Sequence, residues 1–467
     1  MFGISDKIIV DLLIAIGALF ILSNLFYLLL IVSSYKVFKR NKSGWNFMSP
    51  VKKPISLIVP AYNEEKNILT SLESFMNLNY PLYEIILVND GSKDKTLEKV
   101  LSKYSFEDIT STYKKNEKKL SLTKIIKVYF NKELKLTLID KENGGKSDAL
   151  NAGIDFSQHE YFCSVDADSI LHPEAFNTMM LEFNNDPKLI ACGATIRVAN
   201  GSKINQSKDS GFILENLPRK YIELCQYLEY TRSFMTGRVG WENFDSTMII
   251  SGAFGVFKKE SVLSIDGFNI KSIGEDMDLI VRLHKYFLKE NKEYKIGFIP
   301  DPLCWTEVPD NFESLSNQRN RWQRGLISSI LTGDKILIKP GDNPLAKLTI
   351  PYYVLTEIFS PIIEIMSYIL IALGVFIGII SIKIALLFFS VSILFSVMLT
   401  IVALLYEEKY YSKKLDRKSM LELILVSFLE NLGYRQFMSY QRVKGILDHY
   451  RKRTDWGRIE RHGLNVE

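Results

Sequence analysis

Long apolar stretches lie toward both ends of the chain, and a mixed apolar and polar pattern lies between them. The first stretch, residues 8–32, is interrupted only by Asp11, Ser23 and Asn24. It holds about 25 residues, whereas a helix needs roughly 20 to cross a bilayer. It is also longer than a signal-peptide core of about 7–15 residues, and no A-x-A cleavage pattern follows it. The pattern predicts a membrane-spanning helix within residues 1–35.

From residue 54 to about residue 335, short apolar runs alternate with segments of helical periodicity. The runs at residues 55–59, 83–88 and 161–165 each end in polar turn residues. Such a pattern is typical of buried strands joined by helices, and it predicts an α/β domain with a mostly parallel sheet. Residues 102–133 are Lys-rich and weakly patterned, so we interpret them as a surface insertion with room for one helix and a strand.

Two further apolar stretches follow the α/β pattern. Residues 350–380 carry Glu357 and Glu364 in their first half, and residues 382–406 carry one charge near their start. Both stretches are long enough to span a bilayer. The pattern therefore predicts transmembrane helices within residues 345–406.

The last part of the chain has a shorter apolar run. Residues 420–429 are apolar, but Glu430 and Arg435 follow before the length of a span is reached. A charge in the middle of a span costs about 2.5–3.5 kcal/mol on insertion scales. We therefore expect an interfacial helix and a basic cytoplasmic tail within residues 419–467.

The distribution of basic residues predicts the orientation of the spans. Lys7 is the only basic residue before the first apolar stretch, and a basic cluster follows that stretch. The positive-inside rule then puts the central domain in the cytoplasm. A basic tail on the same side requires an even number of crossings after the domain, and two crossings fit. The expected location is the cell membrane, as a multi-pass protein in contact with lipid. The cluster is Lys36, Lys39, Arg40, Lys42, Lys52 and Lys53.

Composition changes this picture little. The 467 residues include 58 basic and 53 acidic ones, for a net charge of +5, so no nucleic-acid partner is indicated. The four cysteines show no C-x-x-C spacing, and we expect free buried thiols in a reducing compartment.

Two carboxylates directly follow the apolar run at residues 161–165. If the chain stays extended beyond Val165, Asp166 and Asp168 point the same way from the carboxyl edge of a strand. Ligands bind at that edge in open α/β sheets. Two oxygen donors there suit a hard divalent cation that also holds phosphates. An acidic turn in solvent is the alternative for an isolated Asp-Ala-Asp.

Three other segments carry candidate chemistry. Asp90 follows a predicted strand and could accept hydrogen bonds from a base or ribose, and Lys146 follows paired glycines where a helix begins and could meet a phosphate. Gln318, Arg321 and Trp322 share one helical face, which brings a guanidinium beside an indole ring. Ordinary turns and a buried packing helix are the alternatives. The chain has no P-loop and no G-x-G-x-x-G, which argues against an ATPase or a dinucleotide enzyme.

Seven motifs follow one another within the α/β pattern, and their order resembles that of the family 2 glycosyltransferases with the GT-A fold. The resemblance is strongest to the membrane-embedded processive polysaccharide synthases, those of poly-N-acetylglucosamine, hyaluronan, chitin and cellulose. It covers residues 54–335 closely and extends to the flanking spans. The motifs are VPAYNEE, VNDGS, NGGKSDALNAG, SVDAD, ISGAFG, GED and QRNRW.

The resemblance implies a role for each motif. Asp276 takes the position of the general base, in Gly-Glu-Asp where the family usually has Thr-Glu-Asp. Asp166 and Asp168 hold UDP through Mg²⁺ or Mn²⁺. The implied nucleotide-sugar contacts are Ala61, Tyr62, Glu64, Asp90, Lys146, Asp166 and Arg321. The implied acceptor contacts are Phe254, Glu275, Gln318 and Trp322.

The tail carries one more similarity. Trp456, Gly457 and Arg458 resemble the W-G-x-R gating segment of hyaluronan-type synthases, which implies a tail that folds back over bound UDP. A basic, lipid-facing tail is an equal alternative.

The resemblance implies an inverting transferase that adds a sugar from a UDP-sugar donor to a growing β-linked polysaccharide. A single in-line displacement needs one base and a neutralised leaving diphosphate. Transfer of one sugar to a lipid acceptor, such as a glycolipid or polyprenyl phosphate, is the enzymatic alternative. A non-catalytic nucleotide-sugar sensor is a third interpretation, disfavoured because Asp166, Asp168 and Asp276 are all present. Since three spans are few for a channel, an accessory subunit or a homodimer is expected as well.

Overall fold

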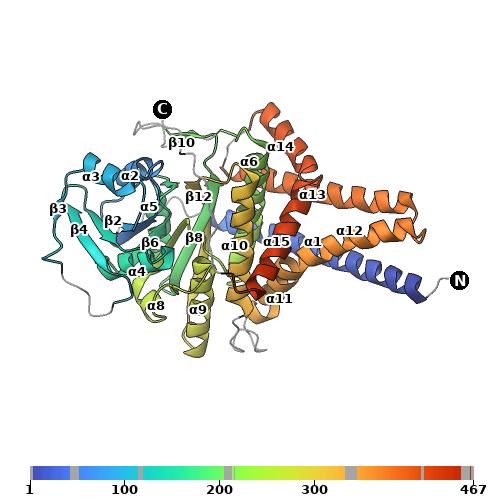
Figure 1. Ribbon diagram of the computed structural model, residues 1–467, viewed down its shortest axis with the longest axis horizontal. Helices are drawn as coiled ribbons and strands as arrows, with labels where there is room; N and C mark the ends of the chain where they lie inside the picture. The colour runs from blue at the N-terminus through green and yellow to red at the C-terminus, as the bar shows by residue number, and fades with distance from the viewer. Residues whose placement is uncertain are drawn as a thin grey trace.

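The computed structural model shows an α/β domain from which three long helices project (Figure 1). The described residues are 4–42, 52–113, 119–204, 213–214, 216–331, 344–411, 415–453 and 463. The predicted gating residues Trp456, Gly457 and Arg458 lie outside them.

A ten-stranded sheet forms the centre of the domain, in the order β3-β4-β5-β2-β1-β6-β11-β8-β12-β7. Strands β5, β2, β1 and β6 run parallel, whereas β11 is antiparallel to both β6 and β8. The strands are β1 (Ile55–Ala61), β2 (Tyr83–Asp90), β3 (Glu107–Asp108), β4 (Ile125–Asn131), β5 (Leu136–Lys141), β6 (Tyr161–Val165), β7 (Ser169–Leu171), β8 (Leu189–Val198), β11 (Phe254–Lys258) and β12 (Lys295–Thr306). A separate two-stranded sheet pairs β9 (Lys203–Ile204) with β10 (Ile213–Leu214).

The three strands predicted from apolar runs are confirmed as β1, β2 and β6, and the parallel order holds for the centre of the sheet. The insertion at residues 102–133 contributes the end of α3 and the antiparallel edge strands β3 and β4. Its described residues form no helix beyond Lys103.

Helices cover both faces of the sheet, because alternate side chains of the central strand pack on opposite sides. Leu57 and Val59 of β1 belong to one apolar cluster, with Phe75 of α2, while Ile58 belongs to another, with Leu150 of α4. The domain helices are α2 (Ile68–Met76), α3 (Thr96–Lys103), α4 (Lys146–Phe156), α5 (Ala175–Asn185), α6 (Tyr221–Tyr230), η1 (Thr231–Arg238), α7 (Val239–Glu242), α8 (Lys259–Leu263), α9 (Glu275–Lys289) and α10 (Phe312–Leu331).

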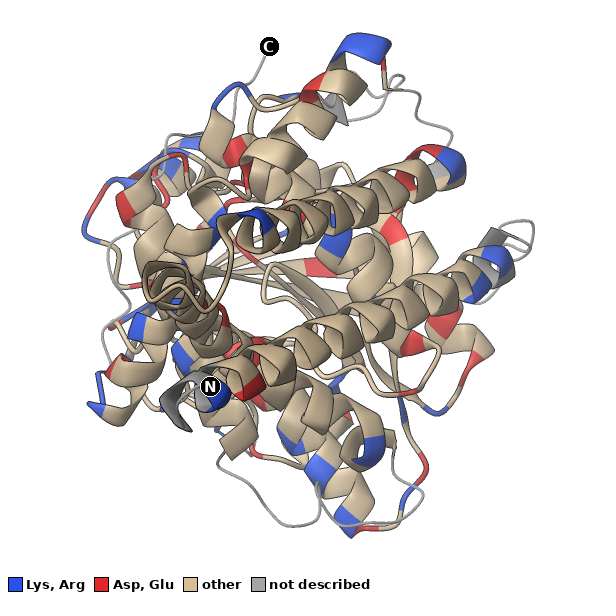
Figure 2. Cartoon of the chain, turned by 90° about the vertical axis from the view of Figure 1, so that its right-hand side faces the viewer, with Lys and Arg blue, Asp and Glu red and all other residues tan. Residues whose placement is uncertain are grey.

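Among the described residues, three helical segments are long and apolar enough to cross a membrane, as predicted. They are Val10–Lys39 within α1 (Ile4–Lys42), Leu345–Phe376 and Ile382–Tyr410 within α13 (Ile382–Tyr411). The second segment runs through η3 (Leu345–Thr349), α11 (Ile350–Tyr352), η4 (Tyr353–Phe359) and α12 (Ser360–Phe376). Figure 2 looks at the side from which these helices project and shows few charged residues along them.

The last two helices, α14 (Arg417–Leu429) and α15 (Tyr434–Tyr450), are not candidate spans among the described residues. Helix α15 packs along α10 and α12. Arg442 donates to the Glu357 carboxylate at 2.7 Å, and Arg435 donates to Glu364 at 2.8 Å. These pairs account for both acidic residues of the second apolar stretch, because a charge within an apolar segment is retained where it is paired inside the protein.

Candidate active site

Three segments from distant parts of the chain meet at the carboxyl edge of the central strands. Asp166 directly follows β6, Lys146 is the first residue of α4, and Glu275 begins α9. The Lys146 Nζ atom lies 2.6 Å from Asp166 Oδ1 and 3.1 Å from Glu275 Oε1. One ammonium group therefore joins the predicted metal carboxylate to the acidic pair that contains the predicted base.

Asp276 lies at the start of α9, and two backbone amides hold its carboxylate. Its Oδ2 atom accepts a hydrogen bond from the Gly252 amide at 3.2 Å, and its Oδ1 atom accepts one from the Met277 amide at 2.8 Å. A Cβ atom at Gly252 would lie 2.8 Å from Lys146 Nζ, so a larger residue there would displace the lysine from its present position. The ISGAFG turn thus leaves room for the lysine while it orients the carboxylate.

The pKa values of the two neighbouring acids, Glu275 and Asp276, are shifted in opposite directions. Burial raises the pKa of Asp276, and the negative charge of Glu275 adds to this effect. Burial also acts on Glu275, but the positive charges of Lys146 and Arg321 outweigh it and lower the pKa of Glu275. Two carboxylates whose environments separate their pKa values are the arrangement that divides acid and base roles at a catalytic site. Asp276 is the more basic of the pair.

The chain does not stay extended beyond β6, so the predicted alternation of Asp166 and Asp168 is wrong. The Ser169 amide donates to the Asp166 carbonyl at 3.1 Å and closes a turn. The Asp166 carboxylate is 28% exposed and faces Lys146, whereas Asp168 is 2% exposed and accepts from Thr306 Oγ1 at 3.3 Å. The turn still leaves the two carboxylates close enough to interact, because the charge of Asp168 contributes to the raised pKa of Asp166.

These carboxylates fit a divalent cation that is shared with a ligand. The described residues contain no group of three His, Cys, Asp or Glu side chains that could hold a metal by themselves. Mg²⁺ is usually held by one or two carboxylates together with substrate phosphates and water. Burial raises the pKa of Asp166 to about 6 against the attraction of Lys146, and Asp168 adds to the shift. The negative charges of Asp168 and Glu275 beside Asp166 favour a cation at this position.

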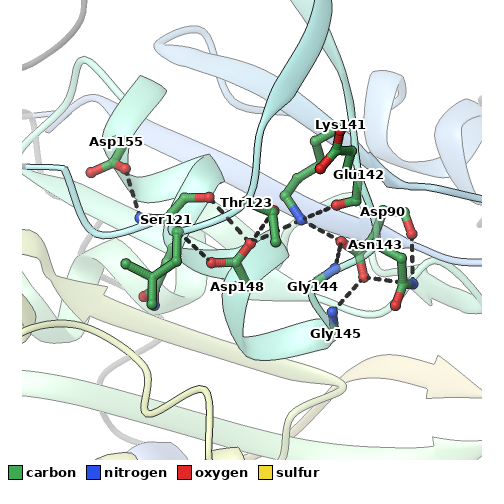
Figure 3. A network of polar contacts seen from close by, with 12 residues as sticks. Asp90, Ser121, Thr123, Lys141, Glu142, Asn143, Gly144, Gly145, Asp148 and Asp155 are labelled. Carbon is green, nitrogen blue, oxygen red and sulfur yellow. Dashed lines mark hydrogen bonds and ion pairs between the residues drawn. The ribbon is translucent and has the colours of Figure 1, made fainter.

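Asp90 holds the glycine turn that precedes α4 (Figure 3). Its carboxylate is 2% exposed and accepts hydrogen bonds from the amides of Gly144 at 3.0 Å and Gly145 at 2.8 Å. Gly145 has a φ angle of +86°, which glycine adopts without strain. Asp90 therefore positions Lys146 through the backbone, in addition to the nucleotide contact predicted for it.

Lys141 completes this anchor, although it belongs to none of the sequence motifs. Its side chain is fully buried and pairs with Asp90 and, at 3.0 Å, with Asp148 (Figure 3). Asp148 also accepts from the Leu122 amide at 2.7 Å and from Thr123 Oγ1 at 2.5 Å. The available signal was a lysine that ends an apolar strand two residues before Asn143 of the Asn-Gly-Gly-Lys motif.

The loops after β1 and β2 are joined to each other. The Asn63 amide donates to Ser92 Oγ at 3.0 Å, and Asn63 Oδ1 accepts from the Lys93 amide at 2.8 Å. Tyr62 is 44% exposed, and Ala61 is buried at the end of β1. Glu64 donates its backbone amide to Thr96 Oγ1 at 2.8 Å. The predicted nucleotide-binding segments therefore form one continuous edge with Asp90.

Helix α10 brings the QRNRW motif to the same place. Arg321 acts on Glu275 through its charge, Gln318 is 8% exposed and Trp322 is 40% exposed. The Arg319 guanidinium lies 4.5 Å above the Trp322 ring and donates to Glu229 Oε2 at 2.6 Å. Arg319, which was not among the predicted site residues, thus supports the exposed indole.

Gly274 determines how closely α9 and α10 approach. A Cβ atom at Gly274 would lie 2.9 Å from the Gly325 Cα atom. This backbone contact explains why glycine stands where the family usually has threonine, and it brings the acidic pair against the QRNRW helix.

One predicted acceptor contact is wrong. Phe254 is fully buried in the apolar core, because it begins β11 and pairs there with Val165 of β6. Its ring packs inside the domain and cannot meet an acceptor.

By sequence, this chain is similar to glycosyltransferases and polysaccharide synthases. A family model described as "Glycosyltransferase like family 2" matches residues 53–325. The poly-beta-1,6-N-acetyl-D-glucosamine synthase of Staphylococcus epidermidis is 29% identical over 272 residues, which cover 58% of this chain and 54% of the relative. The Staphylococcus aureus synthase of the same description is 28% identical over 313 residues, covering 67% and 62% respectively. The matched region thus spans a little over half the length of these relatives.

The fold also occurs in a solved structure. A mannosyltransferase from Pyrobaculum calidifontis, in complex with GDP-Man and Mn²⁺, superimposes with a TM-score of 0.55 at 18% identity. The match covers 91% of this chain and 99% of that one. This likeness shows the GT-A fold.

Proposed function

Because the chain belongs to the glycosyltransferase-like family 2, we propose that it is an inverting transferase that lengthens a β-linked polysaccharide from a UDP-sugar donor. The observation that carries the proposal is the Lys146 bridge between Asp166 and the Glu275–Asp276 pair. The bridge supports the proposal because it joins the edge that we propose to bind the diphosphate to a carboxylate of raised pKa, and transfer from a nucleotide sugar to a hydroxyl needs both.

The relatives support the choice of sugar. The synthases of both Staphylococcus species are described as acting in poly-β-1,6-N-acetylglucosamine formation. We therefore propose UDP-N-acetylglucosamine as the donor and the growing chain as the acceptor. The exposed Trp322 ring offers the acceptor sugar a flat apolar surface.

In the proposed mechanism, the edge formed by Tyr62, Glu64 and Asp90 receives the nucleotide, and Lys146 and Arg321 neutralise the diphosphate. A divalent cation held by Asp166 and Asp168 would act as a Lewis acid on the leaving diphosphate. The acceptor hydroxyl attacks the anomeric carbon in line with the departing UDP, which inverts the configuration. Asp276 Oδ2 takes the hydroxyl proton as the new bond forms.

The three apolar helices associate the protein with a membrane. We propose a multi-pass protein of the cell membrane with its spans within residues 1–35 and 345–406, and with residues 54–335 as a cytoplasmic catalytic domain. The basic residues after the first span support this orientation. Residues 419–467 would form the interfacial helix and tail, and an accessory subunit or a second copy would complete a path for the polymer.

The test uses the full chain, purified in detergent and supplied with Mg²⁺ or Mn²⁺ and single UDP-sugars. We expect UDP release with UDP-N-acetylglucosamine and a β-linked oligomeric product, read by sizing and linkage analysis. A product extracted into organic solvent, carrying one sugar on polyprenyl phosphate, would instead establish transfer to lipid. No transfer with any UDP-sugar would refute the proposal.

Asp276→Asn separates binding from catalysis. We expect UDP binding to persist while turnover falls by about 10²–10⁴-fold, the usual contribution of a general base. Asp278→Asn is the matched control, because Asp278 lies on the same helix and pairs with Arg282 at 2.6 Å. Unchanged turnover in Asp276→Asn would refute the base assignment.

A further inference from the structure

One helix connects the catalytic domain with the membrane segments. Helices α6, η1 and α7 follow one another without a break, and the middle part, η1, is π-helical. Segment η1 contacts β8 and β12 of the sheet on one side and the spans α1 and α13 on the other. Wide π-helical turns occur frequently at functional sites, because they turn side chains away from the regular helical positions.

The first arginine of η1 has a complete set of partners. Arg232 donates to the Glu430 carboxylate at 2.6 and 3.1 Å and to Thr400 Oγ1 at 2.7 Å. A bidentate pair of this kind satisfies the guanidinium and fixes η1 against α13 and α14. The role of Arg232 is therefore structural.

Arg238, at the end of η1, differs from Arg232 because one of its nitrogen atoms lacks a hydrogen-bond partner among the described residues. Its guanidinium carbon lies 4.0 Å above the Phe234 ring, which holds the group flat. Its Nη1 atom is shielded from solvent and makes no hydrogen bond with any described residue. Burial lowers the pKa of Arg238, and the groups that oppose this effect are Tyr353, Asp276 and Tyr230. The carboxylate that acts on this cation is thus that of the candidate base.

The positive charges of Arg238 and Lys146 both lower the pKa of Asp276, and the two residues belong to different elements. Lys146 belongs to α4 and contacts the predicted metal carboxylate Asp166, so it lies on the donor side. Arg238 comes from η1, and its neighbour Tyr353 begins η4 in the second apolar segment. Arg238 therefore lies on the side of the base that faces the membrane helices.

Tyr353, which acts on Arg238, belongs to a cluster of aromatic rings. The Trp241 ring of α7 lies 5.2 Å from the Tyr352 ring and 6.4 Å from the Tyr353 ring, measured between centroids. Phe26 of α1 lies 5.6 Å from Trp241. Trp241 is buried within this cluster, whereas Tyr353 is half-buried. A cation beside such a ring suits a sugar, because the N–H groups can donate to its oxygens while the ring faces its apolar C–H surface.

We propose that Arg238 is an acceptor-binding residue: its unused N–H donates to an oxygen of the terminal sugar and directs the attacking hydroxyl toward Asp276. The inference rests on the proposed function and adds a residue to it. An oxygen ligand would satisfy the shielded Nη1 atom, and it would leave the Asp276 carboxylate available for the proton of the hydroxyl.

The test measures acceptor and donor kinetics separately with short β-linked N-acetylglucosamine oligosaccharides and UDP-N-acetylglucosamine. In Arg238→Ala we expect the KM for the oligosaccharide to rise about tenfold or more, as for the loss of one charge-assisted hydrogen bond. The KM for the donor should stay within about twofold of wild type, and the share of donor hydrolysed to free sugar should increase. Arg238→Lys keeps the charge with a different geometry and should show a smaller rise.

Arg232→Ala is the matched control within the same helix. It should lower the melting temperature and leave the acceptor KM of the folded fraction unchanged. Equal changes in both KM values for Arg238→Ala and Arg238→Lys, or no change in either, would overturn the proposal. So would Arg238-dependent binding of polyprenyl phosphate without dependence for the oligosaccharide. A wild-type protein that transfers no sugar would count against the proposed function instead.

Discussion

Replacement of Lys146 by methionine tests the centre of the site. Methionine has a similar length and no charge, so the change leaves Asp166 and Glu275 without their shared ammonium partner. Removal of one partner from a buried ion pair costs about 3–5 kcal/mol. Because the Asp166 side chain is 28% exposed and partly screened by solvent, we expect the lower end of that range, about 3 kcal/mol.

The loss of stability in Lys146→Met should depend on pH in a defined direction. In the folded wild type the pKa of Asp166 is raised to about 6, above the ordinary aspartate value, so its ionised form is a cost that disappears as pH falls below about 6. The pKa of Glu275 is lowered by Lys146, so its contribution is stabilising above the ordinary glutamate value. Without Lys146 the pKa of each carboxyl group rises. The destabilisation should therefore be largest at alkaline pH and should shrink as pH falls through and below about 6, where Asp166 accepts a proton.

The assay is thermal unfolding in detergent across this pH range. A loss of about 3 kcal/mol corresponds to a decrease in melting temperature of roughly 6–12 °C near pH 8, at about 2–4 °C per kcal/mol for a large domain. Lys188→Met is the matched control, because the side chains of Lys188 and its partner Glu293 are 56% and 79% exposed and their pairing at 2.7 Å is screened. Equal shifts for both variants, or a Lys146→Met shift that does not change with pH, would refute this account.

Three further changes test other parts of the site. Gly274→Thr should cost about 1–3 kcal/mol by overpacking against Gly325, with reduced turnover, whereas Gly17→Ala meets no atom within 4 Å inside helix α1 and should not lower the melting temperature. Lys141→Met should cost about 3–5 kcal/mol and weaken UDP binding measured by calorimetry, because it leaves two carboxylates unpaired beside the glycine turn; unchanged UDP affinity would contradict the anchoring role. Because burial raises the pKa of Asp276, the acid limb of the pH–rate profile should lie above the ordinary aspartate range, and a limb at that ordinary value would count against the assignment.

The sequence alone determined the elements and their order. Apolar runs predicted β1, β2 and β6, and long apolar stretches predicted the three candidate spans, because both kinds of element are recognised by the local spacing of side chains. The ordered motifs also indicated the family. Each of these signals lies within a few consecutive residues, so no knowledge of distant contacts was needed.

Only the tertiary structure decided how the site residues act on one another. The ammonium of Lys146 between Asp166 and Glu275 joins segments far apart in the chain, and no local pattern predicts such a contact. The same holds for the buried Lys141 and for the turn after Val165, where the fold overrides the alternation of an extended strand. Charges and backbones brought together by folding set the proton affinities at this site, and those affinities depend on distance in space rather than on distance along the chain.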